Sequence, residues 1–427
     1  MNDMAELTAR RDAALGAGAP LFYEVPIQIV RGDGVDLFDA DGRRYVDMYN
    51  NVPCVGHANP RVVEAMARQQ ATLNVHSRYL HEGVVAFAER YAALHGPGIE
   101  SVILSCSGTE AIEVALRMAR FATGRRGIIC TDATYHGNSE LVSQLSRVGR
   151  HLPEDSPVQA FAFPETYRPI ADNLSDAELC DAYLADLGRA IDRLQAAGHG
   201  VAALIVCSIF ANEGLPDMPA GFMARAAQMV RDAGGLVIAD EVQAGYARTG
   251  KWWGYEVSGF APDIVVTGKP MGAGLPLAAT AASRALVEGF RARTRYFNTF
   301  ASSPLQAAVG MAVLDEIEQR DLRANVAAVG TGLKERLAQR KGASAAIGDV
   351  RGHGLFIGVE LVDPADGSPD VALAKRTINR LKDKGFLTSN AGAHNNVVKI
   401  RPPLVFSHDN AAEFLVAWDE TVAELMA

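Results

Sequence analysis

Two residues with complementary chemistry, an aspartate and a lysine, each end a short apolar run in the middle of the sequence. Asp240 ends the run LVIAD (236–240), and Lys269 ends the run DIVVTGK (263–269). Runs of this kind are typical of buried parallel strands. Because ligands bind beyond the carboxyl ends of such strands, both side chains should face one crevice. Pro270 disfavours helical geometry in the residue before it, which predicts that Lys269 is extended at the strand tip.

A lysine that faces a carboxylate in an apolar crevice suits one kind of covalent catalysis. Lys269 can form a Schiff base with the aldehyde of pyridoxal 5'-phosphate, while Asp240 keeps the pyridine nitrogen of that cofactor protonated. The same two residues could instead form a structural ion pair at the strand ends. Taken alone, the two residues leave both interpretations open.

A candidate phosphate site lies earlier in the sequence. A short apolar strand at 102–104 leads to Ser107, Gly108 and Thr109, where a helix begins that Gly124 should stop. The free N–H groups at such a helix start, together with the two hydroxyls, would bind a phosphate. An ordinary capped helix gives the same pattern, so this motif also has a structural alternative.

Three loops hold aromatic or charged residues that could line the same crevice. Tyr135 follows a strand at 127–131 and could stack on a cofactor ring, or it could be an ordinary packing tyrosine. His76 and Arg78 could receive an anionic substrate group, or they could belong to a solvated loop. Glu213 lies near the start of a loop that follows a further apolar strand.

The composition is that of a soluble globular enzyme and disfavours several other classes. The chain has 41 Lys and Arg against 50 Asp and Glu, a net charge of −9, which argues against nucleic acid or an anionic membrane as a partner. The start of the sequence has scattered charges and no apolar core, and the apolar stretch from Val201 is too short to span a bilayer. Five dispersed cysteines without CxxC or CxxH spacing predict neither disulfides nor a metal site. We expect a cytoplasmic protein that binds small molecules.

At 427 residues the chain is long enough for two or three domains. Strands and helices alternate up to Lys269, which predicts a doubly wound α/β sheet. Before that sheet, residues 26–47 should form a small antiparallel element. Beyond it, helical spacing runs from 303 to 339 with a break near 319–321. We therefore expect a small domain assembled from residues 1–50 and 316–427 and a large cofactor-binding domain formed by residues 51–315.

Taken together, the motifs resemble those of the class III aminotransferases, from about Pro20 to the carboxyl terminus. The order and spacing of that family are matched by SGTEA, YHGN, IADEVQAGYARTG, TGKPMGAG, NTFASSP and VRGHGLFIGVEL. The resemblance implies the fold type I architecture of pyridoxal-phosphate enzymes. That architecture has a large domain with a mostly parallel, doubly wound sheet and a smaller α+β domain built from the N- and C-terminal segments.

The resemblance also implies a role for each residue of the predicted site. Lys269 would form the internal aldimine and shuttle protons, Asp240 would pair with the pyridinium, and Gln243 would bind the ring hydroxyl. The other cofactor-binding residues would be Val242 and Tyr135 on the two ring faces, and Ser107, Gly108, Thr109 and the partner subunit's Thr299 at the phosphate. A shared site implies a homodimer, with a tetramer as a further option.

Two departures from the family pattern leave the substrate open. In the ornithine and 4-aminobutyrate branches an arginine binds the substrate carboxylate, and here that position is Lys399, with Arg401 on the same strand face. The loop NEGLPDMPAGF is shorter than usual and lacks the form EPxxGxGG. The expected substrate-binding residues are Asn51, Arg78, Glu213, Lys399 and Arg401.

The sequence is most similar to the branch that holds alanine–glyoxylate transaminases, diaminobutyrate-like transaminases and ethanolamine-phosphate phospho-lyases. We therefore expect an aminotransferase that moves an amino group from an amine or omega-amino acid donor to a 2-oxo acid. The alternative is a lyase on the same scaffold that eliminates phosphate or ammonia. A catalytically silent regulator that binds the cofactor is disfavoured, because no DNA-binding segment is appended and every expected catalytic position is filled.

Overall fold

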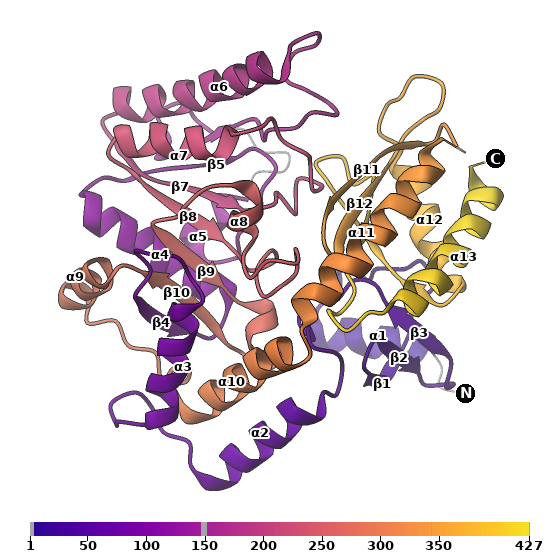
Figure 1. Ribbon diagram of the computed structural model, residues 1–427, viewed down its shortest axis with the longest axis horizontal. Helices are drawn as coiled ribbons and strands as arrows, with labels where there is room; N and C mark the ends of the chain where they lie inside the picture. Colours follow the sequence, from indigo (N-terminus) through magenta and orange to yellow (C-terminus); the bar gives the residue numbers. More distant parts are fainter. Residues whose placement is uncertain (1–3, 147–151, 343, 427) are drawn as a thin grey trace.

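The computed structural model describes residues 4–146, 152–342 and 344–426 and centres on a seven-stranded sheet (Figure 1). The strands stand in the order β4-β10-β9-β8-β7-β5-β6. Their bounds are β4 (Ser101–Ser105), β5 (Gly127–Thr131), β6 (Val158–Phe161), β7 (Val201–Cys207), β8 (Leu236–Asp240), β9 (Ile264–Thr267) and β10 (Ala278–Ala282). Only β10 runs antiparallel to its neighbours, and the pairs from β9 to β6 are all parallel. The predicted mostly parallel sheet is confirmed.

Helices cover both faces of this sheet, because successive strand residues point to opposite sides. Ile128 and Cys130 of β5 belong to one core cluster with residues of α4 (Gly108–Thr123) and α9 (Arg284–Thr294). Ile129 belongs to a second cluster with residues of α6 (Asp176–Ala196) and α7 (Phe222–Asp232). The sheet is therefore doubly wound, and its strands are buried on both faces.

Further helices complete the large lobe in Figure 1 and lead out of it. They are α2 (Pro60–Thr72), α3 (Glu82–Ala93), α5 (Glu140–Ser143), α8 (Gly254–Ser258), α10 (Pro304–Gln319) and α11 (Leu322–Lys341). The predicted break is confirmed, because Asp321 between α10 and α11 has a φ of 45°, which does not continue a right-handed helix. In the described ranges, none of the helices is both long and apolar enough to cross a bilayer.

Two smaller sheets form the second lobe. The first contains β1 (Ile29–Asp33), β2 (Asp36–Asp39), β3 (Arg44–Asp47) and β13 (Phe386–Leu387), and the second contains β11 (Ile347–His353), β12 (Phe356–Leu361), β15 (Val397–Ile400) and β14 (Ser389–Ala391). The predicted N-terminal antiparallel element is confirmed, and β13 extends it by parallel pairing with β3. This pairing brings the two ends of the sequence together.

The helices of the second lobe are α12 (Val371–Asp383) and α13 (His408–Leu425), which lie beside α11 in Figure 1, and α1 (Met4–Leu15) near β1–β3. The predicted division between residues 315 and 316 falls within α10, which continues to Gln319. The exact domain limits stay a prediction.

Candidate active site

The ends of β8 and β9 meet the start of helix α4. Asp240 is the last residue of β8, and Lys269 follows the end of β9 and opens the short 3-10 turn η1 (Lys269–Gly272). A Cβ placed on Gly108, the first residue of α4, would lie 3.1 Å from a methyl group of Val242, and one on Gly268 would lie 3.3 Å from the Gly108 Cα. Glycine at these positions lets the three segments approach closely.

The backbone of Lys269 is not extended, so that prediction was wrong. Its φ is +21°, a value that residues other than glycine seldom adopt. Pro270 keeps Lys269 out of the right-handed helical region, as expected, but it also sits near the start of η1, so the chain turns through positive φ instead of continuing straight. The Lys269 side chain is open to solvent, yet the surrounding protein and the Arg401 charge lower the pKa of its amine.

Asp240 is buried and held by two hydrogen bonds. Its Oδ1 accepts from the Val242 N–H at 2.9 Å, and its Oδ2 pairs with Nδ1 of His136 at 2.6 Å. The other ring nitrogen of His136 pairs with the Thr134 hydroxyl at 3.0 Å. Sequence reasoning did not assign a role to His136, although the motif YHGN after a strand was the available signal. The arrangement leaves Asp240 a fixed hydrogen-bond acceptor at the strand end.

The start of α4 has the features of an anion site. The hydroxyl of Ser107 caps the helix by accepting the Glu110 N–H at 3.2 Å, as the structural alternative expects. Gly137 approaches Thr109 so closely that a Cβ on it would lie 2.5 Å from the Thr109 hydroxyl. The first backbone N–H groups of a helix have no partner within the helix, and the helix dipole favours an anion there. The phosphate-binding roles of Ser107, Gly108 and Thr109 fit this geometry.

A chain of polar contacts joins the predicted ring-binding residues. The amide of Asn212 donates to the Tyr135 carbonyl at 3.0 Å, and its oxygen accepts from the Gln243 amide at 3.0 Å. Gln243 in turn accepts a hydrogen bond from the Arg401 guanidinium. Tyr135 is 42% exposed, and its hydroxyl donates to Asn138. These contacts link the residues expected at the cofactor ring to a residue expected at the substrate.

Lys399 and Arg401 are both buried and both lie near the ring of Tyr49. The Lys399 ammonium is 5.9 Å from the ring centroid and the Arg401 guanidinium 5.0 Å, and Arg401 Nε donates to the Tyr49 carbonyl at 3.0 Å. Burial, followed by the charges of Arg401 and Lys269, lowers the pKa of Lys399 to about 7. Three positive charges therefore face one region, and Tyr49 is a site residue that sequence reasoning missed.

Glu213 is buried in the loop after β7. Its Oε1 accepts from the Thr131 hydroxyl at 2.5 Å, and its Oε2 has no hydrogen-bond partner in the described chain. Burial raises the pKa of this carboxyl. The loop is held from the second lobe, because Arg351 Nε donates to the Gly214 carbonyl at 2.9 Å. Burial therefore disfavours the charged form of Glu213.

The other predicted residues lie in two different settings. Asn51 is 2% exposed, and its amide contacts Arg248, Val242 and Gln243. Arg78 is exposed and its guanidinium lies 4.3 Å from the Phe297 ring, which places it on the same surface as the exposed Thr299. Substrate contact by Asn51 and Arg78 and phosphate contact by Thr299 stay predictions.

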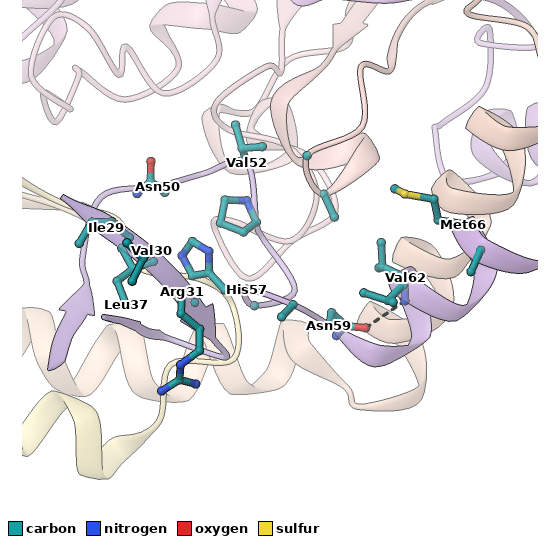
Figure 2. Close-up of a pocket in the computed structure, with 18 of the residues that line it drawn as sticks. Ile29, Val30, Arg31, Leu37, Asn50, Val52, His57, Asn59, Val62 and Met66 are labelled. Atoms are coloured by element: carbon teal, nitrogen blue, oxygen red, sulfur yellow. Dashed lines mark hydrogen bonds between the residues drawn. The ribbon is translucent and has the colours of Figure 1, made fainter. Parts of the chain in front are cut away.

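A cavity of about 930 Å³ lies to one side of these residues (Figure 2). Ile29, Val30 and Leu37 from the first small sheet lie on one side of it, and Val62 and Met66 from α2 lie on the other. Its lining is mostly apolar and includes none of the residues predicted to bind cofactor or substrate. The residues predicted to carry the chemistry therefore do not line this cavity.

The mostly parallel sheet, with Asp240 at the end of one strand and Lys269 just beyond the next, agrees with the fold type I architecture of pyridoxal-phosphate enzymes. The family model for class III aminotransferases matches residues 20–422. The chain belongs to that family, which confirms the resemblance seen in the sequence, and its cofactor is pyridoxal 5'-phosphate. Asp240, which is hydrogen-bonded to His136, fits the ring nitrogen of that cofactor. The start of α4, where Gly108 and Gly137 allow close packing, fits its phosphate.

Individual relatives carry two kinds of name. The chain is 36% identical to a fruit-fly (Drosophila melanogaster) protein named alanine–glyoxylate aminotransferase 2-like, covering 97% of this chain and 86% of that protein. It is 32% identical to ethanolamine-phosphate phospho-lyase homolog 1 of Caenorhabditis elegans, covering 98% and 93%. A solved phospholyase from Arthrobacter in complex with phosphoethanolamine superposes with a TM-score of 0.94 at 41% identity, covering 98% of this chain and all of that chain. The family thus includes both transaminase and lyase activities.

Replacing Lys269 by alanine should abolish turnover and the visible absorbance of the bound cofactor. The fold should survive, because the Lys269 side chain is open to solvent and contributes no core packing. Lys251→Ala provides a matched control, since Lys251 is also exposed and also follows a Thr-Gly pair. Absorbance, turnover and melting temperature should be measured on both variants. Near-normal turnover of Lys269→Ala would contradict its catalytic role.

Replacing His136 by leucine should weaken both cofactor binding and turnover at least tenfold, about 1.4 kcal/mol, because one oxygen of the buried Asp240 loses its partner. Asparagine can present an N–H near the position of the His136 Nδ1, so His136→Asn should recover part of each loss. Cofactor titration and kcat report the two effects. Equal losses in both variants would mean that His136 matters only for packing.

Proposed function

We propose that this enzyme acts on an amine that carries a phosphate ester on the neighbouring carbon and eliminates the phosphate. The observation that carries the proposal is the presence of two buried cations, Lys399 and Arg401, beside Lys269. In the described part of the chain neither cation forms an ion pair with a carboxylate, and their partners are an aromatic ring, a carbonyl and an amide. The Asp47 charge acts on Arg401 without forming an ion pair with it. Buried cations that contact no counter-charge favour an anionic ligand.

The amount of charge favours phosphate over carboxylate. A phosphate monoester carries about −1.5 to −2 charges near neutral pH and has three acceptor oxygens. A carboxylate carries one charge and would leave one of the two cations uncompensated. Arginine can hold a phosphate through two parallel hydrogen bonds, and lysine adds a point charge. The similarity to the Arthrobacter phospholyase, which was solved with phosphoethanolamine, supports ethanolamine phosphate as a substrate.

Lys269 and Asp240 would have separate roles in the removal of the substrate proton. Pyridoxal phosphate supplies, when bound, an aldehyde that condenses with amines and a ring that withdraws electrons. Lys269 removes the proton from the carbon that bears the amine, and the lowered pKa of its amine increases the fraction present as free base. Asp240, fixed by His136, holds the proton on the ring nitrogen.

Arg401 and Lys399 would hold the phosphate while its bond to carbon breaks. In this elimination a C–H and a C–O bond break, a C=C bond forms, and the phosphate leaves with the electron pair of the C–O bond. Water then hydrolyses the resulting enamine to an aldehyde and ammonia. The two cations neutralise the charge that grows on the leaving group, which lowers the barrier to its departure.

Transamination is the second candidate, and the fruit-fly relative named alanine–glyoxylate aminotransferase 2-like favours it. The same proton removal by Lys269 would serve a donor whose neighbouring carbon lacks a leaving group. The amino group would then pass to a 2-oxo acid acceptor, with Arg401 or Lys399 holding the distal carboxylate of the donor. The structure of the substrate, more than the site, would decide between the two outcomes.

Two further expectations accompany this proposal. A homodimer would bring Thr299 to the phosphate site of the partner subunit, and the surface around Thr299 has the exposed apolar residues of an interface. Leu80 is 99% exposed and Phe300 67% exposed, and Phe297 lies beside Arg78. A cytoplasmic location remains the expectation drawn from the sequence.

Incubating the holoenzyme with ethanolamine phosphate should release phosphate, ammonia and acetaldehyde in equal amounts without consuming a 2-oxo acid. Unphosphorylated ethanolamine is the matched control and should react at least a hundredfold more slowly, because it lacks both the anion and the leaving group. Phosphate, ammonia and aldehyde assays report each product. Transfer of nitrogen to glyoxylate or pyruvate without phosphate release would instead identify a transaminase.

Sulfate, a dianion at every pH used, should inhibit turnover of the enzyme more weakly as the pH rises through about 7. Lys399 is an ammonium below that pKa and becomes neutral above it, so part of the anion-binding charge is lost with rising pH. Lys399→Arg should remove this step, because arginine stays charged. Inhibition constants between pH 6 and 8.5 test the prediction. The same step in both proteins would assign it to another group.

A further inference from the structure

Arg248 is a buried arginine that the catalytic steps do not use. It is 0% exposed and forms no ion pair in the described chain, although the charge of Asp47 acts on it. Its Nε donates to the Asn51 amide oxygen at 3.1 Å, and its Nη1 donates to the Leu355 carbonyl at 3.1 Å and to the Pro402 carbonyl. Its Nη2 has no hydrogen-bond partner in the described chain. A guanidinium buried among neutral hydrogen-bond partners is costly, which indicates that Arg248 serves a function that offsets this cost.

Two partners of Arg248, Asn51 and Pro402, lie next to residues predicted to bind cofactor or substrate. Pro402 directly follows Arg401, so the bond to the Pro402 carbonyl fixes the backbone immediately after Arg401. The backbone before it is fixed as well, because the Arg401 N–H donates to the Met48 carbonyl at 2.7 Å. The Arg401 side chain leaves this anchored segment and contacts Tyr49 and Gln243.

Asn51 extends the same network to Val242 and Gln243, in the segment after β8. Its Oδ1 accepts from Arg248, and its Nδ2 lies 3.3 Å from the carbonyl oxygens of both Val242 and Gln243. Gln243 is also the residue that accepts from Arg401. One buried pair, Arg248 and Asn51, therefore connects the segment after β15, the segment after β3 and the segment after β8.

We propose that Arg248, acting with Asn51, is the positioning residue that sets the anion-binding geometry of Arg401. This proposal rests on the proposed function, in which Arg401 holds the substrate anion. A forked guanidinium recognises an oxyanion through two hydrogen bonds only when it is held within a fraction of an ångström, so the anchoring of its backbone determines affinity. The positive charge of Arg248 behind Arg401 adds to the preference for a dianion.

Arg248 reaches Asn51 with Nε and the two carbonyl oxygens with Nη1. A lysine would have to make all three contacts from one nitrogen, so it should not replace Arg248. The pKa of Arg248 is lowered to about 9 by burial and then by the charge of Arg401, which shows that the two guanidinium groups act on each other. A change at Arg248 should therefore reach Arg401 both through the backbone and through charge.

The test compares Arg248→Met, Arg248→Lys and a matched control as holoenzymes. The control is Arg125→Met, because Arg125 also donates to two backbone carbonyls, those of Val201 and Ala233, but at the opposite ends of the strands. Inhibition of turnover by sulfate, whether turnover is phosphate elimination or transamination, measures the affinity of the site for an anion. The rate at which hydroxylamine consumes the visible absorbance of the cofactor measures the reaction of an uncharged amine in the same site.

We expect both Arg248 variants to weaken sulfate inhibition at least tenfold and to change the hydroxylamine rate less than threefold, while Arg125→Met changes neither. If Arg248→Met fails to fold, Arg248→Lys supplies the same comparison with Arg125→Met. Unchanged sulfate inhibition, or equal losses in both assays, would overturn the positioning role. Because sulfate binding needs no phosphate release, a wild-type enzyme that fails to eliminate phosphate would disprove the proposed function without deciding this test. Arg401→Met must weaken sulfate inhibition too, and an unchanged value would overturn the premise.

Discussion

The constraint on which the site depends is buried positive charge without a negative partner. Lys399, Arg401 and Arg248 are all buried, and their contacts in the described chain are with carbonyl oxygens, amides and the Tyr49 ring. Transfer of a charge from water into a protein is unfavourable unless strong partners replace the water. The Asp47 charge acts on Arg401 and Arg248, but none of the three cations forms an ion pair with a carboxylate in the described chain, which favours an anion supplied by the substrate.

The same cluster couples substrate binding to proton transfer. The charge of Arg401 helps to lower the pKa of the Lys269 amine, which favours the free base that catalysis needs. An anion bound at Arg401 would offset that charge and raise the pKa again, which helps Lys269 to keep the proton it has taken. The surrounding fold supplies rigidity. Asp240 is held by His136, and Gly108 lets α4 lie against Val242 in the segment after β8.

The sequence was sufficient to predict site residues that stand at the ends of strands and helices, but not those whose roles depend on contacts with distant segments. Asp240, Lys269 and the start of α4 stand at strand and helix ends that periodicity reveals, and the doubly wound sheet followed from the alternation of strands and helices. Tyr49, by contrast, gains its role from Arg401, 352 positions away, and Arg248 from Asn51 and Pro402. Pro270 illustrates a different limit. It excludes the right-handed helical region for Lys269, but both an extended backbone and a positive φ remain open, and the turn η1 that follows selects the positive φ.

The most direct test of the account is a crystal structure of the holoenzyme with 2-aminoethylphosphonate, whose C–P bond cannot be eliminated as a phosphate ester can. The account predicts that the phosphonate oxygens lie within hydrogen-bond distance of the Arg401 guanidinium and the Lys399 ammonium, with the amine of the ligand directed to the Lys269 side of the crevice. A phosphonate bound elsewhere, with Arg401 and Lys399 left in their present contacts, would contradict it.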